Sequence, residues 1–215
     1  MATPDYYATY CRFFTRNKDE AGLLMGADCC VGDVLDIQID ERASDSEGQL
    51  VNRFGATIGH LNADIIEQVR LARAKGWHTQ ALLASVYFTE PTDKTAGPGY
   101  WGEVVIMCFA DTPAFRAFSN TIAHALGEGL RPTVELGSSG VEKILDSAGE
   151  WLPDGRVPKP DIAHGTAVVK DHLSFNEKMV EQARQRNPGC MAAGWLFIIV
   201  LIAAVVWLVI KLLPM

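Results

Sequence analysis

The N-terminal half of the chain carries short runs of alternating or β-branched apolar residues, separated by polar loops. Runs of this length and pattern are typical of β-strands that are buried on one or both faces. In the segment 34–39 (VLDIQI), for example, Leu35, Ile37 and Ile39 fall on one face. The pattern therefore predicts a small β-rich region, with strands over residues 10–15, 34–39, 79–88 and 103–109.

One helical pattern interrupts these strands. Residues 62–75 (NADIIEQVRLARAK) begin with the cap residue Asn62, repeat apolar residues at helical spacing and stop at Gly76. A polar cap, an acid in the first turn and a terminal glycine are the usual signals of a helix start and stop. We therefore expect one helix inserted among the strands.

After Asp111 the spacing becomes helical. Thr112-Pro113 reads as a cap followed by a first-turn proline, and the apolar stripe behind it ends at Gly127. Two capping boxes, Ser139-x-x-Glu142 and Ser174-x-x-Glu177, predict two further helices. Residues 131–136 are consistent with a short strand, and the prolines at 153, 158 and 160 predict an irregular connector.

The segment 192–210 (AAGWLFIIVLIAAVVWLVI) contains no charge. As a helix it would reach about 28 Å, close to the thickness of a bilayer's hydrocarbon core. Trp195 and Trp207 lie near its two ends, where indoles prefer the interface, and Lys211 can extend its ammonium group to the headgroups. We therefore expect a single transmembrane anchor within residues 192–213, with the lipid bilayer as a partner.

The orientation of this anchor follows from its flanks. Lys178, Arg184 and Arg186 precede the span, whereas only Lys211 follows it. Residues 1–10 lack the basic and apolar regions of a signal peptide. The sequence thus predicts a single-pass, tail-anchored membrane protein whose N-terminal part is cytoplasmic.

Charge and cysteine content disfavour two classes of feature, namely a nucleic-acid partner and a disulfide or metal framework. Acids outnumber bases 26 to 19, and residues 1–112 carry all of the excess. An acidic domain repels polyanions, so a nucleic-acid partner is not expected. The five cysteines show no C-x-x-C spacing, which indicates reduced thiols and neither a disulfide framework nor a metal site. We predict no cofactor and no bound metal.

The segment 55–61 (GATIGHL) leads directly into the predicted helix, and two more strands follow. This order resembles the HIRAN domain, in which a G-x-x-I-G-Y-L segment turns into a helix. The resemblance covers about residues 8–110 and implies a small barrel-like β fold. Gly55 and Gly59 would be structural glycines of this turn, since a glycine allows a bend or a close approach that a side chain would block. The other matching positions are Gly32-Asp33 with the strand 34–39, Ile58, Leu61, the helix end at 74–76 and the strand 103–109.

HIRAN domains of known role bind the 3′ end of single-stranded DNA, so the resemblance implies nucleic-acid end binding as an alternative function. The sequence departs from the family pattern at several positions. The segment 40–46 (DERASDS) replaces N-P-x-D-x-N-A, His60 replaces the tyrosine and Asn62 replaces a proline. A tyrosine able to stack on a base is therefore missing at position 60, and the fold could carry over without the ligand.

No catalytic motif stands out. The histidines show no H-E-x-x-H spacing, and the chain has neither a G-x-S-x-G elbow nor a Walker loop. The candidate ligand-binding residues are His60, Tyr100, Trp101 and Arg12. Tyr100-Trp101 is either an exposed recognition patch or the apolar start of the strand at 103, and we favour the second interpretation.

The sequence therefore predicts an α+β fold: a small HIRAN-like β-barrel domain with one inserted helix, then a small helical region and a single C-terminal transmembrane helix. The predicted function is a membrane-anchored cytoplasmic binding or adaptor module, non-enzymatic, with an unknown ligand and an unknown cytoplasmic partner. An enzyme whose dispersed site cannot be recognised remains a further alternative. The predicted divisions are residues 8–111 (β-rich domain), 112–152 (small helical segment), 153–173 (proline-rich connector), 174–187 (juxtamembrane helix) and 192–213 (anchor).

Overall fold

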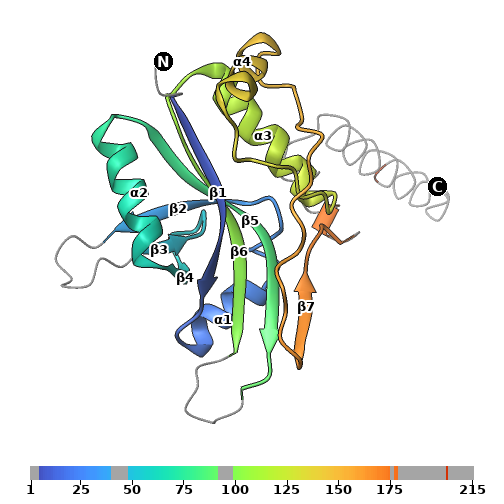
Figure 1. The fold of residues 1–215 in the computed structure, drawn as a ribbon. Helices are drawn as coiled ribbons and strands as arrows, with labels where there is room; N and C mark the ends of the chain where they lie inside the picture. The colour runs from blue at the N-terminus through green and yellow to red at the C-terminus, as the bar shows by residue number, and fades with distance from the viewer. Residues whose placement is uncertain (1–4, 40–47, 92–98, 175–176, 179–201, 203–215) are drawn as a thin grey trace, which may run out of the picture. The chain divides into compact units, whose positions relative to one another are not determined.

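The computed structural model describes residues 5–39, 48–91, 99–174, 177–178 and 202 (Figure 1). The chain separates into two compact units, residues 1–173 and 174–215. In the second unit the predicted capping box is confirmed. The Ser174 amide donates to Glu177 Oε2 over 2.8 Å, and the Glu177 amide donates to Ser174 Oγ over 3.3 Å.

A closed antiparallel β-barrel forms the centre of the first unit (Figure 1). The sheet order is β2-β3-β4-β1-β6-β5-β7, and an additional pairing of β2 with β5 closes six of the seven strands into a ring. The seventh strand, β7, extends the sheet beyond β5. The strands are β1 (Tyr6–Phe14), β2 (Val34–Ile39), β3 (Gly48–Val51), β4 (Thr57–Leu61), β5 (His78–Thr89), β6 (Tyr100–Phe109) and β7 (Thr166–Lys170).

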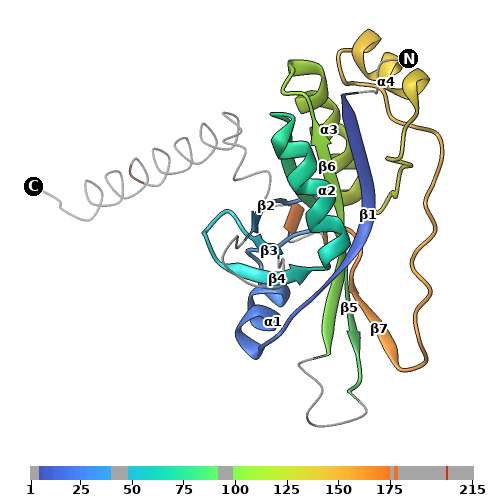
Figure 2. The same ribbon diagram turned by 60° about the vertical axis from the view of Figure 1, so that its left-hand side comes forward.

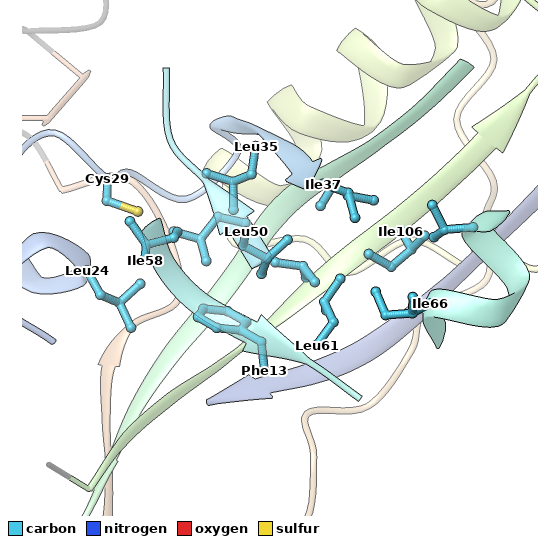
Figure 3. Packing of buried hydrophobic residues seen from close by; sticks show 14 of the residues in the cluster. Phe13, Leu24, Cys29, Leu35, Ile37, Leu50, Ile58, Leu61, Ile66 and Ile106 are labelled. Atoms are coloured by element: carbon cyan, nitrogen blue, oxygen red, sulfur yellow. The ribbon is translucent and has the colours of Figure 1, made fainter. Parts of the chain in front are cut away.

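The barrel interior is filled by apolar side chains from all six of its strands (Figure 3). Because side chains alternate between the two faces of a strand, every second residue contributes, as Val104, Ile106 and Cys108 do on β6. Helix α2 (Ala63–Ala74) adds Ile66 and Val69 to the same cluster. This helix confirms the pattern predicted over residues 62–75; it ends at Ala74, and the chain leaves it through Gly76, where φ is +77°.

A second core lies on the outer face of β1, β5 and β6. It is covered by α3 (Pro113–Gly127) and α4 (Ser138–Asp146), and Figures 1 and 2 show α2 and α3 on opposite sides of these strands. Helix α3 begins as the sequence predicts, with the Thr112 side chain accepting a hydrogen bond from the Phe115 amide. Helix α4 is also confirmed, but Gly137 caps it, so the predicted capping role of Ser139 is wrong.

Strands β3 and β4 were not among the predicted strands, and two further elements absent from the sequence prediction complete the first unit. Helix α1 (Lys18–Met25) follows β1 and begins with an Asn17 cap, whose side chain accepts from the Glu20 amide. Strand β7 brings Lys170 to the other end of this helix. The Lys170 ammonium group donates to the carbonyl oxygens of Leu24 (3.2 Å), Gly26 (2.8 Å) and Cys29 (2.7 Å). A cation at a helix C-terminus is stabilising, so β7 and α1 hold each other in place.

The fold class predicted from the sequence is wrong. The antiparallel barrel is present, but the helices that follow do not form a separate region, because α3 and α4 pack directly on the barrel. The predicted connector 153–173 contains β7, and residues 131–136 form only an isolated bridge, between Pro132 and Arg156. Within the part of the chain that the structure describes, no helix has the length and apolar character needed to cross a bilayer. The predicted span 192–210, apart from Ile202, lies outside the described residues.

The Phe13 ring fixes the spacing of three neighbouring strands. It is fully buried on β1, and a Cβ atom built on either Gly59 of β4 or Gly102 of β6 would overlap it. Both glycines therefore leave room for one aromatic ring between the strands that flank β1. Gly59 lies within strand β4, and the close approach is what requires a glycine there.

We expect Gly59→Val to destabilise the protein by about 1–3 kcal/mol, because the new side chain would force the buried Phe13 ring out of its place. Chemical denaturation monitored by circular dichroism would measure the change. Gly22→Ala is the matched control, since Gly22 lies in helix α1 with open space around it and should be neutral or slightly stabilising. Equal stability of Gly59→Val and the wild-type chain would contradict this packing argument.

None of the cysteines that the structure describes, Cys11, Cys29, Cys30 and Cys108, forms a disulfide, and all but Cys11 are buried. Burial raises the pKa of Cys11, of Cys29 and of Cys108 from the ordinary value of 9.0 to about 12. In the unfolded chain these groups ionise near 9, whereas in the folded chain they stay protonated. The contribution of these three thiols to the free energy of unfolding is therefore fully present below pH 9 and is lost as the pH rises from 9 towards 12.

Two measurements test this expectation. The free energy of unfolding should decrease between about pH 9 and about pH 11, by up to about 1.4 kcal/mol per pH unit for each thiol, and the denaturation midpoint should decrease with it. Iodoacetamide should alkylate Cys11, Cys29 and Cys108 slowly in the folded chain and rapidly after unfolding, as followed by peptide mass spectrometry. A constant midpoint, or equal alkylation in both states, would count against buried neutral thiols.

Candidate functional site

The outer face of the sheet changes character along β1 and β6. Near one end, Ala8 of β1 and Val105 of β6 belong to the apolar core under α3 and α4. Residues four positions away point to the same face, since side chains alternate along a strand. These residues are Arg12 and Trp101, so the face becomes polar and aromatic beyond the cover of the two helices.

A pocket of about 520 Å³ opens on this part of the molecule. Its volume lies within the range of about 300–1,000 Å³ that is usual for ligand sites. Three of the predicted ligand-binding residues, Arg12, Tyr100 and Trp101, meet in it. The full lining is Arg12, Phe14, Thr15, Thr89, Glu90, Pro91, Gly99, Tyr100, Trp101, Asp161, Ala163 and Thr166.

Trp101 is the best-anchored residue of the pocket. Its ring stacks on the buried ring of Tyr87, with centroids 4.3 Å apart and planes 20° from parallel. Its indole N–H donates to Thr89 Oγ1 over 2.9 Å, and this hydroxyl lies 2.9 Å from the hydroxyl of Thr166. Stacking and hydrogen bonding together leave the indole little freedom, so the half-buried ring is a preformed apolar surface.

Arg12 lies over that surface. Its guanidinium carbon is 4.9 Å from the centre of the Trp101 ring, within the range of a cation–π contact. One Nη2 hydrogen is donated to the carbonyl oxygen of Asp161 over 3.2 Å. The guanidinium group thus connects β1 to the segment that precedes β7, while most of its N–H donors make no hydrogen bond within the described residues.

A buried ion pair lies behind Arg12. Across the β1–β6 ladder, Arg12 is paired with Glu103. Glu103 Oε2 accepts a hydrogen bond from Arg131 Nη2 over 2.8 Å, and the side chains of Glu103 and Arg131 are each 9% exposed. The guanidinium carbon of Arg131 also lies 4.7 Å from the ring centre of Tyr10, whose hydroxyl donates to the Pro132 carbonyl oxygen. Burial raises the pKa of Tyr10, which keeps this phenol a neutral donor. The pair fastens the chain at Arg131 to the barrel beside the pocket.

His60 lies elsewhere. It is on β4, and its Nε2 is 3.1 Å from Glu20 Oε1 of α1. The same carboxylate accepts from the Arg16 amide over 2.6 Å and from Asn17 Nδ2 over 2.9 Å. His60 Nδ1 is buried and has no hydrogen-bond partner among the described residues. In this structure His60 connects β4 to α1 and does not line the pocket.

The remaining predicted residues are not part of the pocket lining. Gly55 lies in the turn between β3 and β4, where φ is +80°, and Gly59 lies in β4. Trp195, Trp207 and Lys211 lie outside the described residues. The structure therefore brings together Arg12, Tyr100 and Trp101, and it separates them from His60.

Sequence reasoning missed most of the polar lining. Thr89 and Thr166 are 77 residues apart and meet only because β7 pairs with β5. Asp161 lies in a segment whose prolines predicted no regular structure. The available signal was the β-branched content of residues 166–170 (TAVVK), which is typical of a short strand.

The described residues contain no group of three or more His, Cys, Asp or Glu side chains able to hold a metal ion. Comparisons of the chain with protein-family models, curated proteins and solved structures found no match. The resemblance of residues 8–110 to the HIRAN domain therefore stays a prediction, and the function has to be argued from the pocket itself.

Proposed function

We propose that this chain is a non-enzymatic binding or adaptor module that holds its ligand in the Arg12–Trp101 pocket. The observation that carries the proposal is the preformed pair of an anchored indole and an arginine with unused donors, in a pocket of about 520 Å³. Binding sites commonly combine a mostly apolar surface with a few placed polar groups. The location of the module at the cytoplasmic side of a membrane stays a prediction from the sequence.

Rigidity supports a binding role. The indole is held by Tyr87 and Thr89, and Arg12 is held by the Trp101 ring and the Asp161 carbonyl oxygen. A site whose side chains are already ordered loses little conformational entropy when a ligand arrives. The pocket is therefore suited to recognition without rearrangement of the barrel.

The test is affinity capture with the full-length chain as bait, in extracts of the source organism, followed by mass spectrometry of proteins and small molecules. We expect the wild-type chain to retain at least one specific component that Arg12→Ala loses. Arg53→Ala is the matched control, because Arg53 also lies 4.9 Å over an aromatic ring, that of Phe54, but does not line the pocket. Equal retention by Arg12→Ala and wild type would contradict a binding role for this pocket.

Binding to the end of a single-stranded nucleic acid is the second candidate. One observation favours it, since an arginine and the aromatic residues Phe14, Tyr100 and Trp101 line one pocket, as in many single-strand binding sites. The pocket also contains the carboxylates of Glu90 and Asp161, which oppose a phosphate backbone. We therefore rank this function below recognition of a less charged ligand.

Fluorescence anisotropy with a labelled oligonucleotide that has a free 3′-hydroxyl distinguishes the two candidates. At about 150 mM salt we expect the full-length chain to bind it no more tightly than the roughly 10⁻⁴ to 10⁻⁶ M of non-specific association. An oligonucleotide blocked at its 3′ end is the control and should bind equally. Sub-micromolar binding that is lost on blocking and on Arg12→Ala would make nucleic-acid end binding the better proposal.

A further inference from the structure

The polar groups that the pocket leaves available define the chemistry of its ligand. The indole N–H of Trp101 is donated to Thr89, the Thr89 and Thr166 hydroxyls pair with each other, and the Thr15 hydroxyl donates to the Tyr100 carbonyl oxygen. These groups satisfy one another. The rest of the wall is mostly apolar, and the charged residues that line the pocket are Arg12, Glu90 and Asp161.

Arg12 is the natural anchor for an anion. A guanidinium group presents a planar fork of donors that matches a carboxylate or a phosphate in a bidentate pair. The contacts of Arg12 within the described residues use one of its N–H donors, that to the Asp161 carbonyl oxygen. Its stacking on Trp101 fixes the plane of the fork, so an anion that binds it lies beside the exposed edge of an aromatic surface.

The two carboxylates limit the charge of that anion. Glu90 and Asp161 line the same pocket and are exposed, so the lining residues carry one positive and two negative charges. A phosphate monoester carries a charge of about −1.5 to −2 at neutral pH and would be repelled more strongly than a carboxylate. A single negative charge on an apolar body fits this arrangement better than a phosphate or a polyanion.

We propose that the Arg12–Trp101 pocket binds a monocarboxylate carried on an aromatic or other apolar group. The carboxylate pairs with the Arg12 fork, and the apolar body lies against Trp101 and the neighbouring wall. This inference rests on the proposed binding function and specifies its ligand class. Two sources carry this chemistry, namely a free organic acid and the C-terminal carboxylate of a peptide that ends in an apolar residue.

Calorimetric titration of the full-length chain tests the inference with matched probes. N-acetylphenylalanine supplies the carboxylate and the ring, its amide supplies the ring without the charge, and phenyl phosphate supplies a dianion. We expect the acid to bind at least about tenfold more tightly than the amide and more tightly than phenyl phosphate. A short peptide ending in phenylalanine distinguishes the two sources. Tighter binding of this peptide than of N-acetylphenylalanine, lost when the terminus is amidated, would identify a peptide C-terminus as the ligand, and tighter binding of N-acetylphenylalanine would identify a free organic acid.

Variants of Arg12 test whether this residue causes the preference for the acid over the amide. Arg12→Gln should abolish the tenfold preference for the acid, while Arg53→Gln should leave it unchanged. Arg12→Lys, which keeps the charge without the planar fork, serves as a second variant and should reduce the preference partially. Thermal melts of each variant show whether it is folded.

The outcomes separate the inference from the proposed function. If the acid and the amide bound equally tightly and Arg12→Gln weakened both to the same extent, the carboxylate inference would be overturned while a binding role of the pocket would stand. Tighter binding of phenyl phosphate than of the acid would likewise overturn it. Failure of every probe to bind at millimolar concentration would overturn the inference, and the proposed function would then depend on the capture experiment alone.

Discussion

The fit of one aromatic ring between two glycines governs the geometry of the barrel. Phe13 lies on the central strand β1, and its ring occupies the space that side chains on Gly59 and Gly102 would fill. The three strands involved are therefore held in register around one buried side chain, because packed interiors tolerate little change in volume. Arg12 and Phe14, the neighbours of Phe13 in sequence, must then point to the outer face, where both line the pocket.

The same sheet thus serves two purposes on its two faces. Inside, it encloses the core that closes the barrel. Outside, it carries α3 and α4 over part of its length and the pocket over the rest. The bulge between Leu83 and Ser85 lies near the point where β5 exchanges its partner β2 for β7, and this exchange brings Thr166 beside Thr89. The position of the pocket is consequently a result of the topology.

The sequence predicted what depends on local periodicity. Strand β2 and helices α2 and α3 carry strong apolar repeats and caps, so their positions follow from the chain. Helix α1 is short and weakly amphipathic, and its sequence signal is limited to the N-terminal capping box Asn17-x-x-Glu20. The barrel closure, the docking of α3 and α4 and the pairing of β7 depend on contacts between distant residues, which periodicity does not record. For the same reason Arg12 and Trp101 were singled out individually, but their meeting with Thr89, Asp161 and Thr166 was not predicted.

The attachment of Lys170 to the carbonyl groups of Leu24, Gly26 and Cys29 has a consequence for ligand binding. Strand β7 pairs with β5 and, through Lys170, also contacts the C-terminal end of α1 and the loop that follows it, so it connects parts of the chain separated by about 80 to 146 residues. Asp161, which lies in the segment that precedes β7, belongs to the pocket wall that this strand holds in place. Any ligand that contacts this wall would hold the strand against the barrel, so occupancy of the pocket and retention of the final strand are thermodynamically linked.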